Sequence, residues 1–128
     1  MKKFFTCLFM ICAFALSSCS NDSDEDPTTY SLEFNSTSHS SIITTNIMLF
    51  EYNSSNETIK SSTVENCTEG LKKVFTADDN AVKVKVYVKL ETSSATKNRW
   101  IDQVYYLKKN SNTRITIDDN TIVCIQEP

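Results

Sequence analysis

The chain has 128 residues, with 13 Lys and Arg against 16 Asp and Glu and a formal net charge of −3 at pH 7. Nucleic-acid binding requires a clustered excess of Lys and Arg, so this charge balance argues against nucleic acid as a partner. The length allows one domain of about 100 residues behind a targeting segment, which is enough chain to bury a core.

The first 18 residues have the three parts of an export signal. Lys2 and Lys3 form a basic start, an apolar run extends from Phe4 to Leu16, and small residues follow. The apolar run is too short to cross a bilayer as a helix, which requires about 20 residues. A retained anchor helix is the alternative, and the acidic run after Ser20 offers nothing to lengthen the span.

The next segment, Leu16-Ser17-Ser18-Cys19, resembles the lipobox of bacterial lipoproteins. The resemblance implies that residues 1–18 are a lipoprotein signal peptide and that cleavage makes Cys19 the new N-terminus. It also implies that Cys19 is lipidated through its thiol, with further acylation of the freed amine by fatty acids such as palmitate. The chain would then be tethered to a membrane by lipid.

Residues 19–29 are expected to form the lipidated cysteine and a flexible acidic tether, because they lack the apolar surface needed to fold. The run from Ser20 to Asp26 is similar to the signal that sends Bacteroidetes lipoproteins to the outer face of the outer membrane. A plain soluble linker and a periplasmic location are the alternatives. Without residues 1–18, the chain has 11 basic and 16 acidic residues, a net charge of −5. Four of these acids lie in the tether, which leaves the body nearly neutral.

Residues 30–128 are predicted to form one all-β domain. The clearest strand is Val82–Glu91, in which Val and Leu alternate with Lys, Tyr and Glu, the period-two pattern of a half-buried strand. Ile42–Tyr52 is apolar on both faces, so its inward face stays open. The other strands are expected at Tyr30–Phe34, Thr58–Val64, Lys73–Thr76, Trp100–Leu107, Thr113–Ile117 and Thr121–Ile125.

Turns rich in Asn and Asp separate these strands, at 53–56, 78–80, 109–112 and 118–120. Asn and Asp tolerate positive φ, and the chain has only one glycine to share that role. Seven or eight short strands with such turns predict a small antiparallel β-sandwich, Ig-like or transthyretin-like, with a small β-barrel as the alternative.

Two of the turns share the order Thr-x-Asp-Asp-Asn-x-aliphatic. Their aspartates, Asp78, Asp79, Asp118 and Asp119, are weak candidates for calcium ligands, because Ca²⁺ binds carboxylate and carbonyl oxygens. Neither turn has the spacing of a known calcium loop, and the turn chemistry alone accounts for the order. We therefore predict no metal and no other cofactor.

Two cysteines, Cys67 and Cys124, remain once Cys7 and Cys12 leave with the signal and Cys19 carries lipid. In an exported protein such a pair is a candidate disulfide. Two separate thiols that behave as small hydrophobes are the alternative.

Aromatic residues give the candidate binding surface. Alternation sends Trp100 and Tyr106 to one face of their strand and Tyr105 to the other, and Tyr87 lies on the polar face of its own strand. One set must be core, and the other could stack against sugar rings or a partner protein. Cross-strand surface packing is the alternative.

No catalytic motif accompanies these features, and the single histidine, His39, has no carboxylate or metal-ligand partner nearby in sequence. We therefore expect a non-enzymatic surface lipoprotein that binds a glycan or a protein partner, as an accessory to a surface complex. One alternative is an inhibitor of a host or competitor enzyme that inserts the loop Thr92–Asn98 into an active site. The other is a hydrolase with an unrecognised site.

Overall fold

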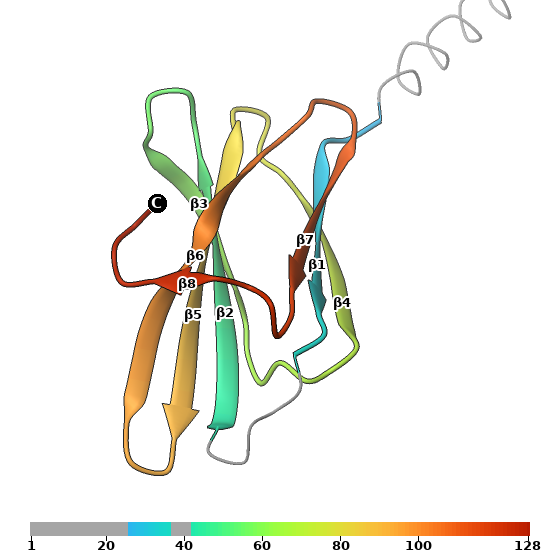
Figure 1. Ribbon diagram of the computed structural model, residues 1–128. Helices are drawn as coiled ribbons and strands as arrows, with labels where there is room; N and C mark the ends of the chain where they lie inside the picture. Colours follow the sequence, from blue (N-terminus) through green and yellow to red (C-terminus); the bar gives the residue numbers. More distant parts are fainter. Residues whose placement is uncertain (1–25, 37–41) are drawn as a thin grey trace, which may run out of the picture.

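The computed structural model describes residues 26–36 and 42–128, and in this part of the chain two β-sheets pack face to face (Figure 1). The signal peptide, Cys19, most of the tether and His39 lie outside the described residues. One sheet has the order β4 (Leu71–Thr76), β1 (Thr29–Phe34), β7 (Asn112–Ile117). The other has the order β3 (Thr58–Val64), β2 (Ile42–Tyr52), β5 (Lys83–Thr92), β6 (Thr96–Tyr106), β8 (Val123–Cys124).

The predicted β-sandwich is confirmed, and the barrel alternative is wrong, because the two sheets do not close on each other. Strand pairing is antiparallel with one exception: β1 pairs in parallel with β7. A parallel pair needs a long connection, and here the chain builds most of the five-stranded sheet between the two strands. In the described ranges no helix is long and apolar enough to cross a bilayer.

The core lies between the sheets and follows the alternation seen in the sequence. Val84, Val86 and Val88 of β5 are buried, whereas Val82 lies just before the strand and is exposed. In β2 the inward face carries Ile47 and Leu49, which settles the orientation that the sequence left open. The three-stranded sheet and β6 contribute Tyr30, Leu32, Phe34, Ile101, Tyr105, Ile115 and Ile117.

The short connections use asparagine as predicted. Asn56 and Asn110, in two of the predicted turns, have φ values of 62° and 59°, and Asn66 has 52°. Gly70 has φ of 88° in the loop before β4. These left-handed conformations place the unusual backbone geometry on residues that adopt it at low cost.

Several strand boundaries differ from the prediction, most of all near the end of the chain and at the β5–β6 hairpin. β8 has two residues instead of Thr121–Ile125, because Ile122 and Ile125 face solvent and have no strand to cover them. The predicted loop Thr92–Asn98 shrinks to a tip of three residues, 93–95, between β5 and β6. A hydrogen bond of 2.8 Å from the Thr92 amide to the Ala95 carbonyl closes this tip.

The candidate disulfide between Cys67 and Cys124 is not formed, and the alternative of two separate thiols describes the structure. Both thiols are free, with Cys67 buried and Cys124 partly exposed. The Cys67 amide bonds to the Thr45 carbonyl on β2, whereas Cys124 pairs with Trp100 of β6 as part of the opposite edge strand β8. With strands about 4.8 Å apart, the intervening strands keep the sulfurs well beyond bonding distance.

A buried polar contact joins the two sheets. Glu51 of β2 is fully buried, and its Oε2 accepts a hydrogen bond of 2.7 Å from the Tyr30 hydroxyl of β1. Its Oε1 accepts one of 2.7 Å from the Asp78 amide, and Lys60 Nζ lies 3.7 Å from Oε2. Burial, followed by the bond to Glu51, raises the pKa of Tyr30. The carboxylate is therefore compensated on both oxygens.

Candidate functional site

The four predicted binding residues divide between the two faces of the five-stranded sheet. Tyr87 and Trp100 lie on the outer face and are partly exposed, and Tyr106 is 70% exposed at the end of β6. Tyr105 points to the other side and is 8% exposed within the core cluster. Three of the four residues therefore remain available on the outer face, and the fourth belongs to the interior.

Trp100 is the centre of an aromatic patch, which we define as Phe50, Tyr87 and Trp100. Its ring centroid lies 4.8 Å from that of Tyr87, edge to face, and 5.7 Å from that of Phe50. Strand register explains the contact with Tyr87, because the two residues are direct partners across β5 and β6. Such contacts orient the rings and leave each of them half-buried.

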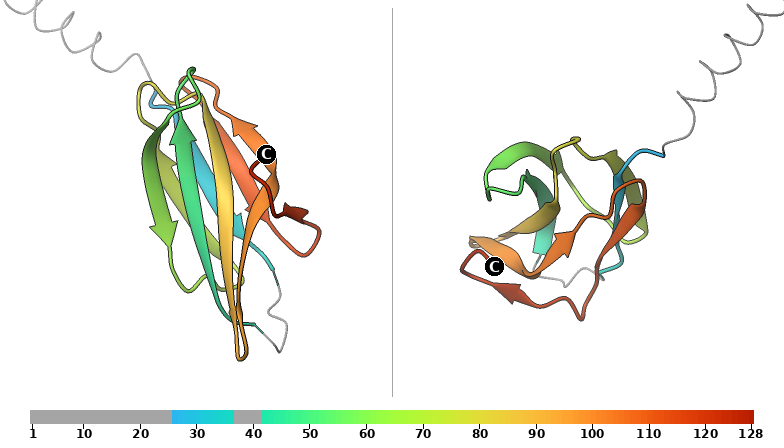
Figure 2. Two further views of the ribbon diagram at one scale, coloured as in Figure 1. Left: turned by 90° about the vertical axis from the view of Figure 1, so that its left-hand side faces the viewer. Right: turned by 90° about the horizontal axis from the view of Figure 1, so that it is seen from above.

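The end of the chain returns to the five-stranded sheet (Figure 2) and contacts side chains of β2 and β5. Glu127 Oε1 lies 2.9 Å from Lys85 Nζ and accepts a hydrogen bond of 2.8 Å from the Tyr52 hydroxyl. The Lys85 ammonium also lies 4.7 Å from the centre of the Tyr52 ring. The bond from Lys85, followed by that from Tyr52, lowers the pKa of Glu127.

The lysines of β5 do not form a free basic stripe. Lys83 donates to the side chain of Asn56, Lys85 pairs with Glu127, and Lys89 Nζ lies 3.8 Å from a Glu91 carboxylate oxygen. Each ammonium thus has a polar partner, and two of the partners are carboxylates. The outer face is therefore nearly neutral around the aromatic patch.

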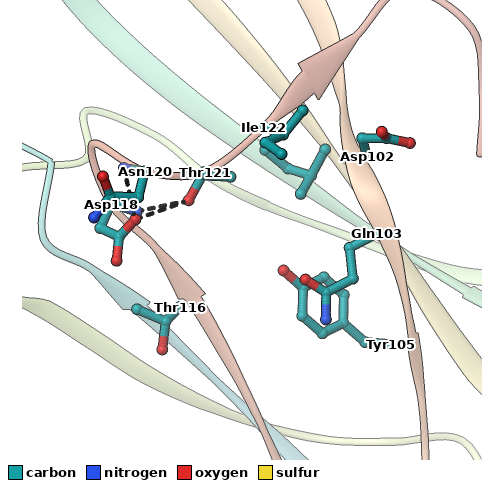
Figure 3. A pocket seen from close by; sticks show the side chains of 9 residues that line it. Asp102, Gln103, Tyr105, Thr116, Asp118, Asn120, Thr121 and Ile122 are labelled. Carbon is teal, nitrogen blue, oxygen red and sulfur yellow. Dashed lines mark hydrogen bonds between the residues drawn. The ribbon is translucent and has the colours of Figure 1, made fainter.

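A separate cavity of about 270 Å³ lies at the side of the sandwich, between β6 and the connection from β7 to β8 (Figure 3). Asp118, Asn120 and Thr121 face Gln103 and Tyr105 across it, and Thr116 lies on the same side as Asp118. Asp102, Ile101 and Ile122 complete the lining. Burial, followed by the negative charge of Asp118, raises the pKa of the Tyr105 hydroxyl.

The two Asp-Asp-Asn turns have the same internal hydrogen bonds. In each turn the first aspartate accepts a bond of 2.9 Å from the amide two residues on, Asp78 from Asn80 and Asp118 from Asn120. The carbonyls of Asp78 and Asp118 also accept bonds from the amides three residues on, at 3.0 and 3.1 Å. The shared order is thus explained by turn chemistry.

These turns lie at opposite ends of the three-stranded sheet. β4 ends opposite the start of β1, whereas β7, which is parallel to β1, ends opposite the end of β1. The four carboxylates therefore do not converge on one calcium ion. Within the described ranges, no three His, Cys, Asp or Glu side chains gather closely enough to hold a metal ion.

Sequence reasoning missed Phe50, Glu127 and the cavity, although it had named two of the cavity residues, Tyr105 and Asp118, for other roles. Phe50 was one of several apolar residues on a strand whose inward face was open, so only the position of β2 beside β5 brings it to Trp100. The cavity joins residues from β6 and β7 that are distant in sequence. Comparisons with protein-family models, curated proteins and solved structures find no significant match for this chain.

Proposed function

We propose that this protein is a bacterial outer-membrane lipoprotein, facing the cell surface, whose β-sandwich is a non-catalytic module that binds a glycan through the aromatic patch. The anchor rests on the resemblance of Leu16–Cys19 to a lipobox and on the acidic run after it. The binding activity rests on one observation above all: Trp100 holds two further aromatic rings in a half-exposed row on the outer face of the sheet.

The chemistry around the aromatic patch suits a sugar. Apolar C–H faces of sugar rings pack against aromatic rings, and their hydroxyls need donors and acceptors nearby. On the strand beside Phe50 and Met48, the register partners are Ser61 and Thr63, both exposed. Aromatic faces and hydroxyls therefore alternate across neighbouring strands of one surface.

The aromatic patch is already assembled without a ligand. The rings stand on the paired strands β2, β5 and β6, and Trp100 contacts both of the other rings. A preformed surface loses less side-chain entropy on binding, which favours affinity from a small contact area. The near-neutral surroundings favour a neutral or weakly charged glycan over a polyanion.

The anchor is tested by replacing Cys19 with Ala. Lipidation requires the thiol, so the variant should leave the membrane pellet and appear in the soluble fraction. A Ser18→Thr variant is the matched control, because it keeps the thiol. If Cys19→Ala stays in the pellet, the uncleaved N-terminal segment is the anchor and the lipoprotein assignment is wrong.

Glycan binding is tested on an array with the wild-type protein, Trp100→Ala and Val74→Ser. Val74 is 60% exposed on the other sheet, so it reports the loss of an exposed apolar side chain away from the aromatic patch. We expect binding by the wild type and Val74→Ser and at least a tenfold loss in Trp100→Ala. The absence of binding across the array would overturn the glycan proposal, and a protein would then be the expected class of partner.

The exposed hairpin tip favours a second candidate, an inhibitor that inserts residues 93–95 into an active site. All three residues are exposed, and the hairpin reaches beyond the rest of the sandwich (Figure 1). Replacing Ser93 and Ser94 together by Asp would abolish inhibition found in an enzyme panel. If a confirmed inhibition persists after this change, the hairpin tip is not the segment that enters the active site.

A further inference from the structure

Tyr105 presents an unused hydroxyl to the cavity between β6 and β7. The side chain is 8% exposed, and its hydroxyl faces the wall formed by Asp118 (Figure 3). Among residues 26–36 and 42–128, no side chain or backbone group forms a hydrogen bond with this hydroxyl. No buried polar side-chain atom of these residues lacks a partner, so the hydroxyl is open to the cavity and is available to bond to a ligand or to water.

Asp118 holds a carboxylate in a fixed position on the opposite wall. Its Oδ1 accepts from the Asn120 amide at 2.9 Å and from Thr121 Oγ1 at 3.3 Å, while its own amide donates to Thr121 Oγ1 at 2.9 Å. Both of these side-chain bonds use Oδ1, which leaves Oδ2 with capacity to accept from a ligand. The turn thus pre-organises an acceptor, and binding does not have to order it.

The charge of the lining selects the sign of the ligand. Asp102 and Asp118 are both among the lining residues, and none of the residues that line the cavity is Lys, Arg or His. The rest of the polar lining consists of hydroxyls and amides, from Gln103, Tyr105, Thr116, Asn120 and Thr121. An ammonium group would pair with the Asp118 carboxylate, and neighbouring hydroxyl groups would use the remaining donors and acceptors.

We propose that this cavity binds a small organic ammonium ion that also carries hydroxyl groups, of the size and chemistry of an amino sugar. The volume of about 270 Å³ is close to the lower end of small-molecule sites, about 300–1,000 Å³. The ammonium lies against Asp118, and the Tyr105 hydroxyl bonds to the ligand. The site is separate from the aromatic patch, which is on the outer face of the sheet.

The test uses the whole chain in a mild detergent, with glucosamine as the probe and glucose as the uncharged match. Backbone amide signals of Gln103, Thr116 and Asn120 are followed by NMR during each titration. We expect saturable shifts with glucosamine at a dissociation constant of about 1 mM, as for a small, exposed site, and at least tenfold weaker binding of glucose. Raising the salt concentration should weaken the glucosamine shifts.

Asp118→Asn and Tyr105→Phe are the informative variants. Asn keeps an oxygen that can cap the turn, so Asp118→Asn removes charge with little change in structure, and it should weaken glucosamine binding at least tenfold. Tyr105→Phe removes the hydroxyl alone and should weaken it several-fold. Asp78→Asn makes the same change in the matching turn at the other end, which has no part in the cavity, and should leave binding unchanged.

Three results would overturn the proposal. The first is the absence of saturable shifts in folded wild-type protein. The second is equal binding of glucose and glucosamine, which would show that charge plays no part. The third is equal weakening by Asp118→Asn and Asp78→Asn, which would reflect turn stability. None of these results bears on the aromatic patch, so glycan binding there succeeds or fails on its own.

Discussion

Replacing Tyr30 by phenylalanine removes one hydroxyl from the buried contact between the two sheets. In the wild type this hydroxyl is fully buried and donates to Glu51 Oε2 at 2.7 Å. Its aromatic ring stacks on Phe75 with centroids 5.3 Å apart, and phenylalanine keeps that contact. The substitution therefore isolates the hydrogen bond from the packing of the ring.

The expected loss of unfolding free energy is about 2 kcal/mol. A hydrogen bond to a charged group contributes about 1.5–3 kcal/mol, and a buried acceptor that loses its donor carries a desolvation penalty of about 1–3 kcal/mol. Lys60 Nζ, 3.7 Å from Glu51 Oε2, remains and keeps the loss near the middle of this range. For a domain of this size the loss lowers Tm by about 8–16 °C.

Urea unfolding, followed by far-ultraviolet circular dichroism, measures the change. Tyr106→Phe is the matched control, because Tyr106 is 70% exposed and its hydroxyl is available to water. We expect the control to stay within about 0.5 kcal/mol of the wild type. If Tyr30→Phe also stays within that range, Glu51 is not a buried, compensated carboxylate and the reasoning is wrong.

Three further predictions concern other parts of the fold. Alkylation of the native protein should label Cys124 faster than buried Cys67, and a peptide that links the two by a disulfide would contradict the structure. The bond from Arg114 lowers the pKa of Glu33, so its stabilisation is complete above the ordinary Glu pKa of about 4.3 and is lost as the pH falls through the lowered value. Glu33→Gln should flatten the acid side of a plot of urea midpoint against pH, and an unchanged slope would refute this. Glu127→Ala should speed amide hydrogen exchange over residues 125–127 and change the unfolding free energy by less than about 1 kcal/mol, whereas unchanged exchange would show that Glu127 does not hold the tail.

The sequence predicted the strands well because most of them carry their own signal. Alternation marks β5, and even the weak segment Thr58–Val64 is a strand. It is an edge strand with few buried residues, which explains its faint pattern. β8 was predicted too long, because apolar Ile122 and Ile125 extend the strand-like pattern of the sequence although both side chains face solvent.

The pairing of strands that are far apart in the sequence could not be predicted from the sequence. Nothing local in β1 or β7 specifies that they pair in parallel. Only the strand order puts β5 and β6 between Cys67, which bonds to β2, and Cys124, which lies in the edge strand β8. The burial of Glu51 could not be predicted for the same reason. Its carboxylate is accommodated in the core only because the Tyr30 hydroxyl and the Asp78 amide, both distant in sequence, donate hydrogen bonds to it. Alternation did predict that Tyr105 and Trp100 face opposite ways, although it did not say which side was core.

The most direct test of glycan binding by the aromatic patch is the fluorescence of Trp100. It is the only tryptophan in the chain, so any change in tryptophan emission arises at the centre of the aromatic patch. Titration with the glycans of the array should give a saturable emission change in the wild type and in Val74→Ser, and a strongly weakened one in Tyr87→Ser. A glycan that binds the protein while the Trp100 emission stays constant would contradict the proposed surface.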